Sequence, residues 1–192
     1  MAKRYRRLAA VTAAFSGVLG SLFPWGAARA DNFGSGPTNV GPPTNEISLG
    51  NNKWHSYSFH SASSAWRTAL NNAAVDGYNP TDVDTSQIGD SQNTDVRVVA
   101  SALSTGVYGW VSCPVDATRS GTDPTETCWN QWLKFDTGNA GAFDSAKRKS
   151  LMCHEFGHTL GLRHREGSPL GCMTNGSTWP TLPTDHDKIH LN

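Results

Sequence analysis

The stretch His154-Glu-Phe-Gly-His158-Thr-Leu-Gly161-Leu-Arg-His164 constrains the fold of this chain more than any other part of the sequence. Residues four apart on an α-helix lie one turn apart on the same face, so His154 and His158 can direct ring nitrogens to one point. Glu155 is rotated by about a quarter turn from His154 and lies beside that point. Gly161 can adopt the left-handed conformation that ends a helix, after which the chain turns back and His164 can supply a third ligand.

A site built from these side chains has the composition of a catalytic zinc centre. Three protein ligands leave a fourth position open for water, whereas structural zinc sites are closed. The carboxylate of Glu155 is suited to accept a proton from that water. A lone histidine is more often a surface or core residue, but the five fixed positions together have a chance expectation of roughly 10⁻⁵ in a chain of this composition.

Residues 154–173 resemble the signature of the metzincin metalloproteases, H-E-x-x-H-x-x-G-x-x-H followed by a turn that contains methionine. Met173 stands where that methionine is expected, and the segment 132–135 before the zinc helix is similar to matrixin-like and small bacterial members. The resemblance implies an α+β, zincin-like fold with a twisted mixed sheet, a long zinc-binding helix and a Met turn beneath one catalytic Zn²⁺. It also implies a zinc metalloendopeptidase in which Glu155 is the general base.

The resemblance further implies where a protein or peptide substrate binds. In metzincins an extended substrate adds to the edge of the sheet, and by element order the residues 107–112 are the candidate edge strand. Gly109 and Trp110 are therefore candidate substrate-binding residues. Trp179 lies in the segment that would line the pocket after the cleaved bond, although a plain packing role explains it equally well.

The chain departs from the metzincin pattern at two positions and lacks one familiar device. Arg165 after the third histidine matches no subgroup, and Asn175 stands where some subgroups carry a tyrosine that assists zinc. No cysteine lies between Ala30 and Cys113, so a cysteine-switch propeptide is not expected. The subgroup therefore stays open.

Two disulfides are expected, because an exported chain with an even number of cysteines favours them. The cysteines are Cys113, Cys128, Cys153 and Cys172, and three pairings are possible. No C-x-x-C pair is present, which disfavours a cysteine-rich structural zinc site. The resemblance favours the local pairing, because a bridge from Cys153 to Cys172 would tie the zinc helix to the Met turn.

Residues 1–30 have the layout of a secretory signal peptide. Basic residues precede an apolar stretch from Leu8 to Phe23, and Ala28-Arg29-Ala30 has the small-residue pattern of a cleavage site. A membrane anchor is the alternative, but the apolar stretch is short and is broken by two glycines. We expect cleavage after Ala30 and a secreted, extracellular protein. Residues 31–52 form a flexible lead-in or a short propeptide, and residues 53–192 form the catalytic domain.

The charge balance argues against nucleic-acid partners. The whole chain has 16 basic and 16 acidic residues, and residues 1–30 hold five basic and no acidic ones. Cleavage after residue 30 would leave 16 − 5 = 11 basic and 16 acidic residues, a net charge of −5. A monomer without stable membrane association is expected. The alternatives to a protease are a non-catalytic zinc-stabilised module that binds a peptide or glycan, and a zinc hydrolase that acts on a non-peptide bond.

Periodicity predicts the remaining elements. Strands are expected at 53–60, 96–103, 107–112 and 131–135, and helices at 61–75, 145–160 and 184–192, with Gly77 ending the first helix and Asp144 or Ser145 capping the second. Residues 82–95 are expected to form a polar loop. Four aspartates in it could hold Ca²⁺, but without EF-hand spacing a solvated acidic loop is the favoured interpretation: Asp82, Asp84, Asp90 and Asp95.

Overall fold

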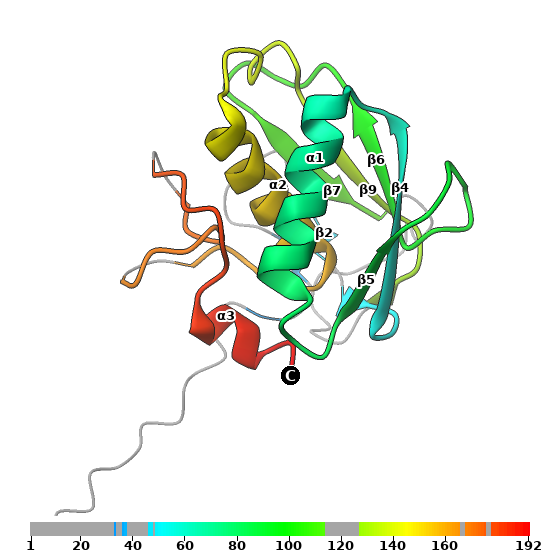
Figure 1. The fold of residues 1–192 in the computed structure, drawn as a ribbon, viewed down its shortest axis with the longest axis vertical. Helices are drawn as coiled ribbons and strands as arrows, with labels where there is room; N and C mark the ends of the chain where they lie inside the picture. Colours follow the sequence, from blue (N-terminus) through cyan, green and yellow to red (C-terminus); the bar gives the residue numbers. More distant parts are fainter. Residues whose placement is uncertain are drawn as a thin grey trace, which may run out of the picture.

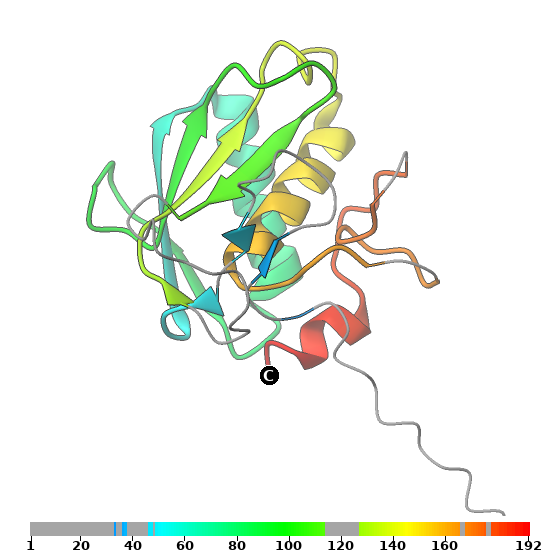
Figure 2. The ribbon, with the colours of Figure 1, turned by 180° about the vertical axis from the view of Figure 1, so that it is seen from behind.

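Two helices cover one face of a five-stranded mixed sheet in the computed structural model, which describes residues 33, 36–37, 46–47, 49–113, 127–165, 168–175 and 178–192. Helices α1 (Ser64–Ala73) and α2 (Ser145–Thr159) pack side by side in front of the sheet in Figure 1, and Figure 2 shows the sheet from its other side. The strand order is β5-β4-β6-β9-β7. The expected combination of helices and a twisted mixed sheet is therefore present.

The edge strand of this sheet differs from the rest in direction. Strands β5 (Asp84–Gln87), β4 (Trp54–Ser61), β6 (Val96–Ala100) and β9 (Gln131–Phe135) run parallel, whereas β7 (Gly109–Ser112) runs antiparallel to β9. Among the described residues β7 pairs only with β9, so β7 is an edge strand of this sheet. The expected edge strand at 107–112 is thus an edge strand, beginning two residues later.

Alternation along the strands places the core between the sheet and the helices. In β9, residues 131, 133 and 135 are buried and residues 132 and 134 are half-buried, as the period of two requires. The buried side chains of β4, β6 and β9 meet those of α1 and α2, with the largest fully buried apolar ones being Tyr78, Phe135, Phe156, Leu70, Leu133, Met152, Leu162 and Met173.

Two sequence expectations are wrong in this region. The helical segment does not stop before Gly77, because α1 is followed directly by a π-helical turn, η1 (Ala74–Tyr78), after which Asn79 N donates to Ala74 O at 3.0 Å. A Cβ at Gly77 would make a tight contact, 3.0 Å from Cδ of Pro183. The residues 82–95 are not loop throughout, because Asp84–Gln87 pairs with β4 as a polar, mostly exposed edge strand.

Several short elements surround this body. Strands β1 (Gly36–Pro37) and β2 (Glu46–Ile47) pair with each other, β3 (Leu49–Gly50) pairs with β8 (Thr127–Cys128), and α3 (Asp185–Ile189) lies near the C-terminus. Strand β2 lies against β7. Phe33 forms an isolated bridge with Leu162 and stacks on His190 at 5.4 Å. Parts of the expected lead-in therefore contact the body.

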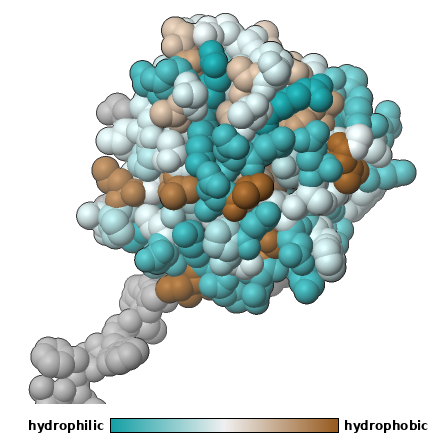
Figure 3. Space-filling view, viewed as in Figure 1, coloured by the Kyte–Doolittle hydropathy of each residue, from teal (hydrophilic) through white to brown (hydrophobic). Residues whose placement is uncertain are grey.

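The expected signal peptide, residues 1–30, lies outside the described residues. Among the residues that are described, no helix has the length and apolar character to cross a membrane. Figure 3 shows the helical side of the molecule, where hydrophobic residues are scattered among hydrophilic ones. Single exposed apolar side chains of this kind are normal on a protein surface.

Candidate metal centre

Helix α2 presents the metal-binding motif at its C-terminal end. The Asp144 carboxylate accepts a hydrogen bond from Lys147 N at 2.8 Å, which caps the helix as expected. Gly161 has φ +96°, the left-handed conformation that reverses the chain after the helix. A Cβ at Gly161 would also clash with Leu49 and lie 3.3 Å from the ring of Phe33, so both conformation and space require glycine.

Three histidine side chains converge on one point. The Nε2 atom of His154 lies 3.0 Å from Nε2 of His158 and 3.0 Å from Nε2 of His164, and the latter two atoms are 3.3 Å apart. Three nitrogens at the usual zinc–nitrogen length in a tetrahedral arrangement would be separated by about 3.3 Å. Within the described ranges this triad is the single cluster of three or more His, Cys, Asp or Glu groups able to hold a metal ion.

Backbone carbonyls fix the orientation of two of these rings. His154 Nδ1 donates to Cys172 O at 2.7 Å, and His158 Nδ1 donates to Leu162 O at 2.7 Å. A carbonyl only accepts, so each Nδ1 carries the proton and each Nε2 presents its lone pair to the centre. His164 Nδ1 is buried and has no hydrogen-bond partner among the described residues.

Burial also keeps the imidazoles neutral. Desolvation lowers the pKa of His154, and it lowers the pKa of His158 to well below the usual range, with a further contribution from the neighbouring histidines. The pKa of His164 is lowered to about 4, chiefly by desolvation and then by His154 and Arg163. Metal ligands must be deprotonated, so this environment favours metal binding near neutral pH.

Glu155, the residue after His154, has a buried side chain. Its side chain is 5% exposed, and desolvation raises the pKa of its carboxyl to about 8. The backbone of β7 packs directly on it, since a Cβ at Gly109 would lie 2.5 Å from Cδ of Glu155. A bound cation would favour the ionised carboxylate and lower this pKa.

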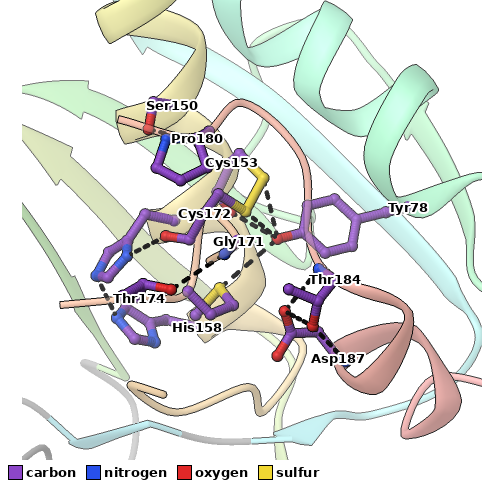
Figure 4. The surroundings of a disulfide bond; sticks show 12 residues. Tyr78, Ser150, Cys153, His158, Gly171, Cys172, Thr174, Pro180, Thr184 and Asp187 are labelled. Atoms are coloured by element: carbon purple, nitrogen blue, oxygen red, sulfur yellow. Dashed lines mark hydrogen bonds between the residues drawn. A yellow bond between two sulfur atoms is a disulfide. The ribbon is translucent and has the colours of Figure 1, made fainter. Parts of the chain in front are cut away.

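Met173 is fully buried in a turn, as the sequence predicts, and its Sδ lies against Gly157 of α2. The structure joins Cys153 to Cys172 and Cys113 to Cys128, the local pairing that the resemblance favours. The first bridge connects the residue before His154 to the residue before Met173, and Figure 4 shows this region. Its Cα atoms are 5.9 Å apart.

The other predicted site residues are distributed between the two faces of the sheet. Gly109 lies on the helix-facing side with the buried Val111 and touches Glu155, whereas Trp110 alternates to the opposite side, where its ring meets Lys134 Nζ at 5.0 Å. The structure therefore does not bring Trp110 to the metal centre. Trp179 packs edge-to-face on Phe143 at 4.7 Å and is part of an aromatic cluster with Tyr108.

The four aspartates proposed as a weak calcium candidate make separate contacts. Asp95 accepts hydrogen bonds from N and Oγ of Ser56, at 2.8 and 2.7 Å. Asp90 lies 3.1 Å from His60 and 3.9 Å from Arg97. Asp84 belongs to strand β5, so the expected acidic loop is divided between a strand and a turn.

Sequence reasoning missed three buried polar residues that support α2. Tyr78 donates to Cys153 O at 2.6 Å, while His55 Nε2 lies 2.9 Å from Thr159 Oγ1 and Gln131 Nε2 donates to Thr159 O at 2.6 Å. These contacts are made to Cys153, one residue before His154, and to Thr159, one residue after His158. Nothing local in the sequence points to them.

No protein-family model matches this chain, and no curated protein matches it. Among solved structures, one of myroilysin is similar with 18% identity and a TM-score of 0.39, covering 61% of this chain and 52% of that one. A second structure of myroilysin has 19% identity and a TM-score of 0.41, covering 68% and 52%. This chain thus spans about half the length of these structures.

Proposed function

We propose that this chain is a secreted zinc-dependent endopeptidase of the metzincin type, with His154, His158 and His164 as ligands of one Zn²⁺ and Glu155 as general base. The observation that carries the proposal is the convergence of three Nε2 atoms within 3.3 Å of one another, beside a buried carboxylate. Three imidazoles suit zinc among the available divalent ions, whereas Ca²⁺ prefers oxygen ligands.

The residues present fit a catalytic rather than a structural zinc site. The two disulfides occupy all four cysteines, so no thiolate remains to close the coordination sphere. When bound, zinc would polarise the scissile carbonyl and lower the pKa of its water to near 7. Glu155 directly follows His154 in the sequence and is not required to hold the ion.

Glu155 then carries the proton of the reaction. Its carboxylate accepts a proton from the attacking water, and the resulting carboxyl delivers it to the nitrogen of the leaving amine. Gly109 packs against Glu155 and belongs to the edge strand β7, along which an extended peptide could pair. A substrate strand on that edge would run past the general base. Strand β2 lies against the same strand, so the lead-in and a substrate would share this surface.

The remaining assignments extend the same proposal. Residues 1–30 are the signal peptide, residues 31–52 a lead-in or short propeptide, and residues 53–192 the catalytic domain. Two disulfides are compatible with an oxidising, extracellular location. N-terminal sequencing of the exported protein tests the first boundary: it should begin at Asp31, and a protein that begins at Met1 would contradict it.

Casein cleavage by the exported protein tests the function. The assay compares the protein as prepared, after a chelator, after zinc is added back, and as the variant Glu155→Gln. We expect cleavage that the chelator abolishes and zinc restores, with normal zinc content but almost no turnover in the variant. Stoichiometric zinc without cleavage of any protein would instead indicate the non-catalytic binding module, and retained activity in Glu155→Gln would refute the assignment of the base.

A further inference from the structure

The hydroxyl of Tyr78 lies among buried residues next to the candidate metal centre. Tyr78 lies at the end of η1 and is fully buried, with its hydroxyl directed between α2 and the Met turn (Figure 4). The hydroxyl donates to Cys153 O at 2.6 Å and lies 3.6 Å from the sulfur of Cys153 and 3.6 Å from that of Cys172. It is also 3.8 Å from Sδ of Met173.

The hydroxyl, rather than the ring, requires an explanation. A phenylalanine would fill the same apolar volume and would leave no buried donor to satisfy. The hydroxyl has one proton to donate, and the structure directs it to the carbonyl of the residue that precedes His154. Burial raises the pKa of Tyr78 well above its usual range, so the group remains a donor.

Gly157 is a second, independent indication that the Tyr78 hydroxyl has a fixed position beside α2. A Cβ at Gly157 would lie 2.6 Å from the Tyr78 hydroxyl and would clash with Sδ of Met173. Gly157 occupies the turn between His154 and His158, so the missing side chain leaves room for the hydroxyl and the thioether beneath the ligands. The same contact point thus involves the helix, the Met turn and η1.

We propose that Tyr78 is a positioning residue for the metal centre, and this inference rests on the proposed function. Its hydroxyl acts through two routes that end at the same ligand. One route is Cys153, whose carbonyl accepts the hydrogen bond and which directly precedes His154. The other is the turn at Cys172, whose carbonyl accepts the Nδ1 proton of His154.

The variant Tyr78→Phe tests the proposal, with Tyr57→Phe as a matched control. Tyr57 is also a buried tyrosine, its ring also packs on Phe156, and its hydroxyl donates to Asn71 Oδ1 at 3.0 Å, away from Cys153 and the Met turn. Each variant loses one hydroxyl and one hydrogen bond. Thermal unfolding midpoints are measured to check that both variants are folded at the assay temperature.

Metal binding is the first readout, because it needs no substrate. Zinc affinity is measured by competition with a chromophoric chelator, and the visible spectrum of the Co²⁺-substituted protein reports ligand geometry. We expect Tyr78→Phe to weaken zinc binding by about tenfold, the lower end for residues that orient metal ligands, and to shift the Co²⁺ spectrum. In peptide cleavage kcat should fall with KM unchanged, and Tyr57→Phe should match the wild type throughout.

The proposal is overturned if Tyr78→Phe keeps wild-type zinc affinity and Co²⁺ spectrum, or if Tyr57→Phe changes them equally. Gly157→Ala is a second variant that crowds the same point, and an unchanged Co²⁺ spectrum there would also count against the proposal. If the wild type binds zinc but cleaves no peptide, the proposed function fails while the metal readouts still decide the role of Tyr78.

Discussion

Replacing Gly109 by alanine should abolish the proposed peptidase activity without removing the proposed zinc ion. The new Cβ would lie 2.5 Å from Cδ and 2.6 Å from Cγ of Glu155, whereas ordinary contacts begin at 3.4 Å. The carboxylate or strand β7 must therefore move by about 1 Å, a misplacement that can lower turnover by about 100-fold, or about 2.7 kcal/mol in transition-state stabilisation. Overpacking would also destabilise the fold by about 1–3 kcal/mol.

The assay separates this effect from general damage. Kinetics with a fluorogenic peptide give kcat and KM, atomic absorption gives zinc content, and thermal unfolding shows whether the variant is folded at the assay temperature. Gly89→Ala is the matched control, because a Cβ at Gly89 has no atom within 4 Å. We expect Gly109→Ala to retain zinc and to lose kcat, and Gly89→Ala to match the wild type. A folded Gly109→Ala protein with wild-type kcat would refute this account of the contact between β7 and Glu155.

Three further predictions concern stability and metal. Burial lowers the pKa of His55 to about 4, so protonation of His55 opposes folding. The stability that is present above pH 6.5 should be lost as the pH falls towards 4, by at most about 3 kcal/mol. Urea unfolding at pH 7 and pH 4.5 measures this loss, and His55→Gln should reduce it. The disulfides Cys153–Cys172 and Cys113–Cys128 close loops of 19 and 15 residues, so removing either one should lower the free energy of unfolding by about 3 kcal/mol. Only the loss of Cys153–Cys172 should weaken zinc binding. Equal zinc affinities of the two variants would contradict the link between this disulfide and the site. Chelation should lower the thermal midpoint by mass action, and adding zinc should restore it; an unchanged midpoint would mean that no ion stabilises the native state.

The parts of the site that sequence predicted are those with a local signature. The spacing of His154 and His158 requires only helical periodicity, and Gly161 ends the helix through its own backbone conformation. Asp144 caps the same helix through a contact three residues away. Each of these features depends on neighbours in the chain, so a single sequence is sufficient to recognise it.

The features that sequence missed depend on distant partners. Tyr78 and His55 meet α2 across 75 and 104 residues, and neither has a local pattern that indicates it. Strand β5 is polar because it lies at an edge, so its residues resemble a loop until β4 is placed beside them. The orientation of Trp110 could have been predicted from the sequence, because alternation along a strand places Trp110 on the face opposite to the buried Val111.

The three candidate ligands are close together in the sequence, whereas the residues that hold them in place are farther away in the sequence. All three proposed ligands lie within residues 154–164, whereas several contacts that support this segment come from residues 18, 75 and 104 positions away in the sequence. A chain that has only begun to fold already holds its histidines within a short loop, whose closure is inexpensive in entropy. In the proposed enzyme, metal could therefore bind before tertiary packing is complete, and catalytic activity should appear later than metal binding. In a refolding experiment the two signals should separate in time, with the Co²⁺ spectrum sharpening only when η1 and the Met turn dock.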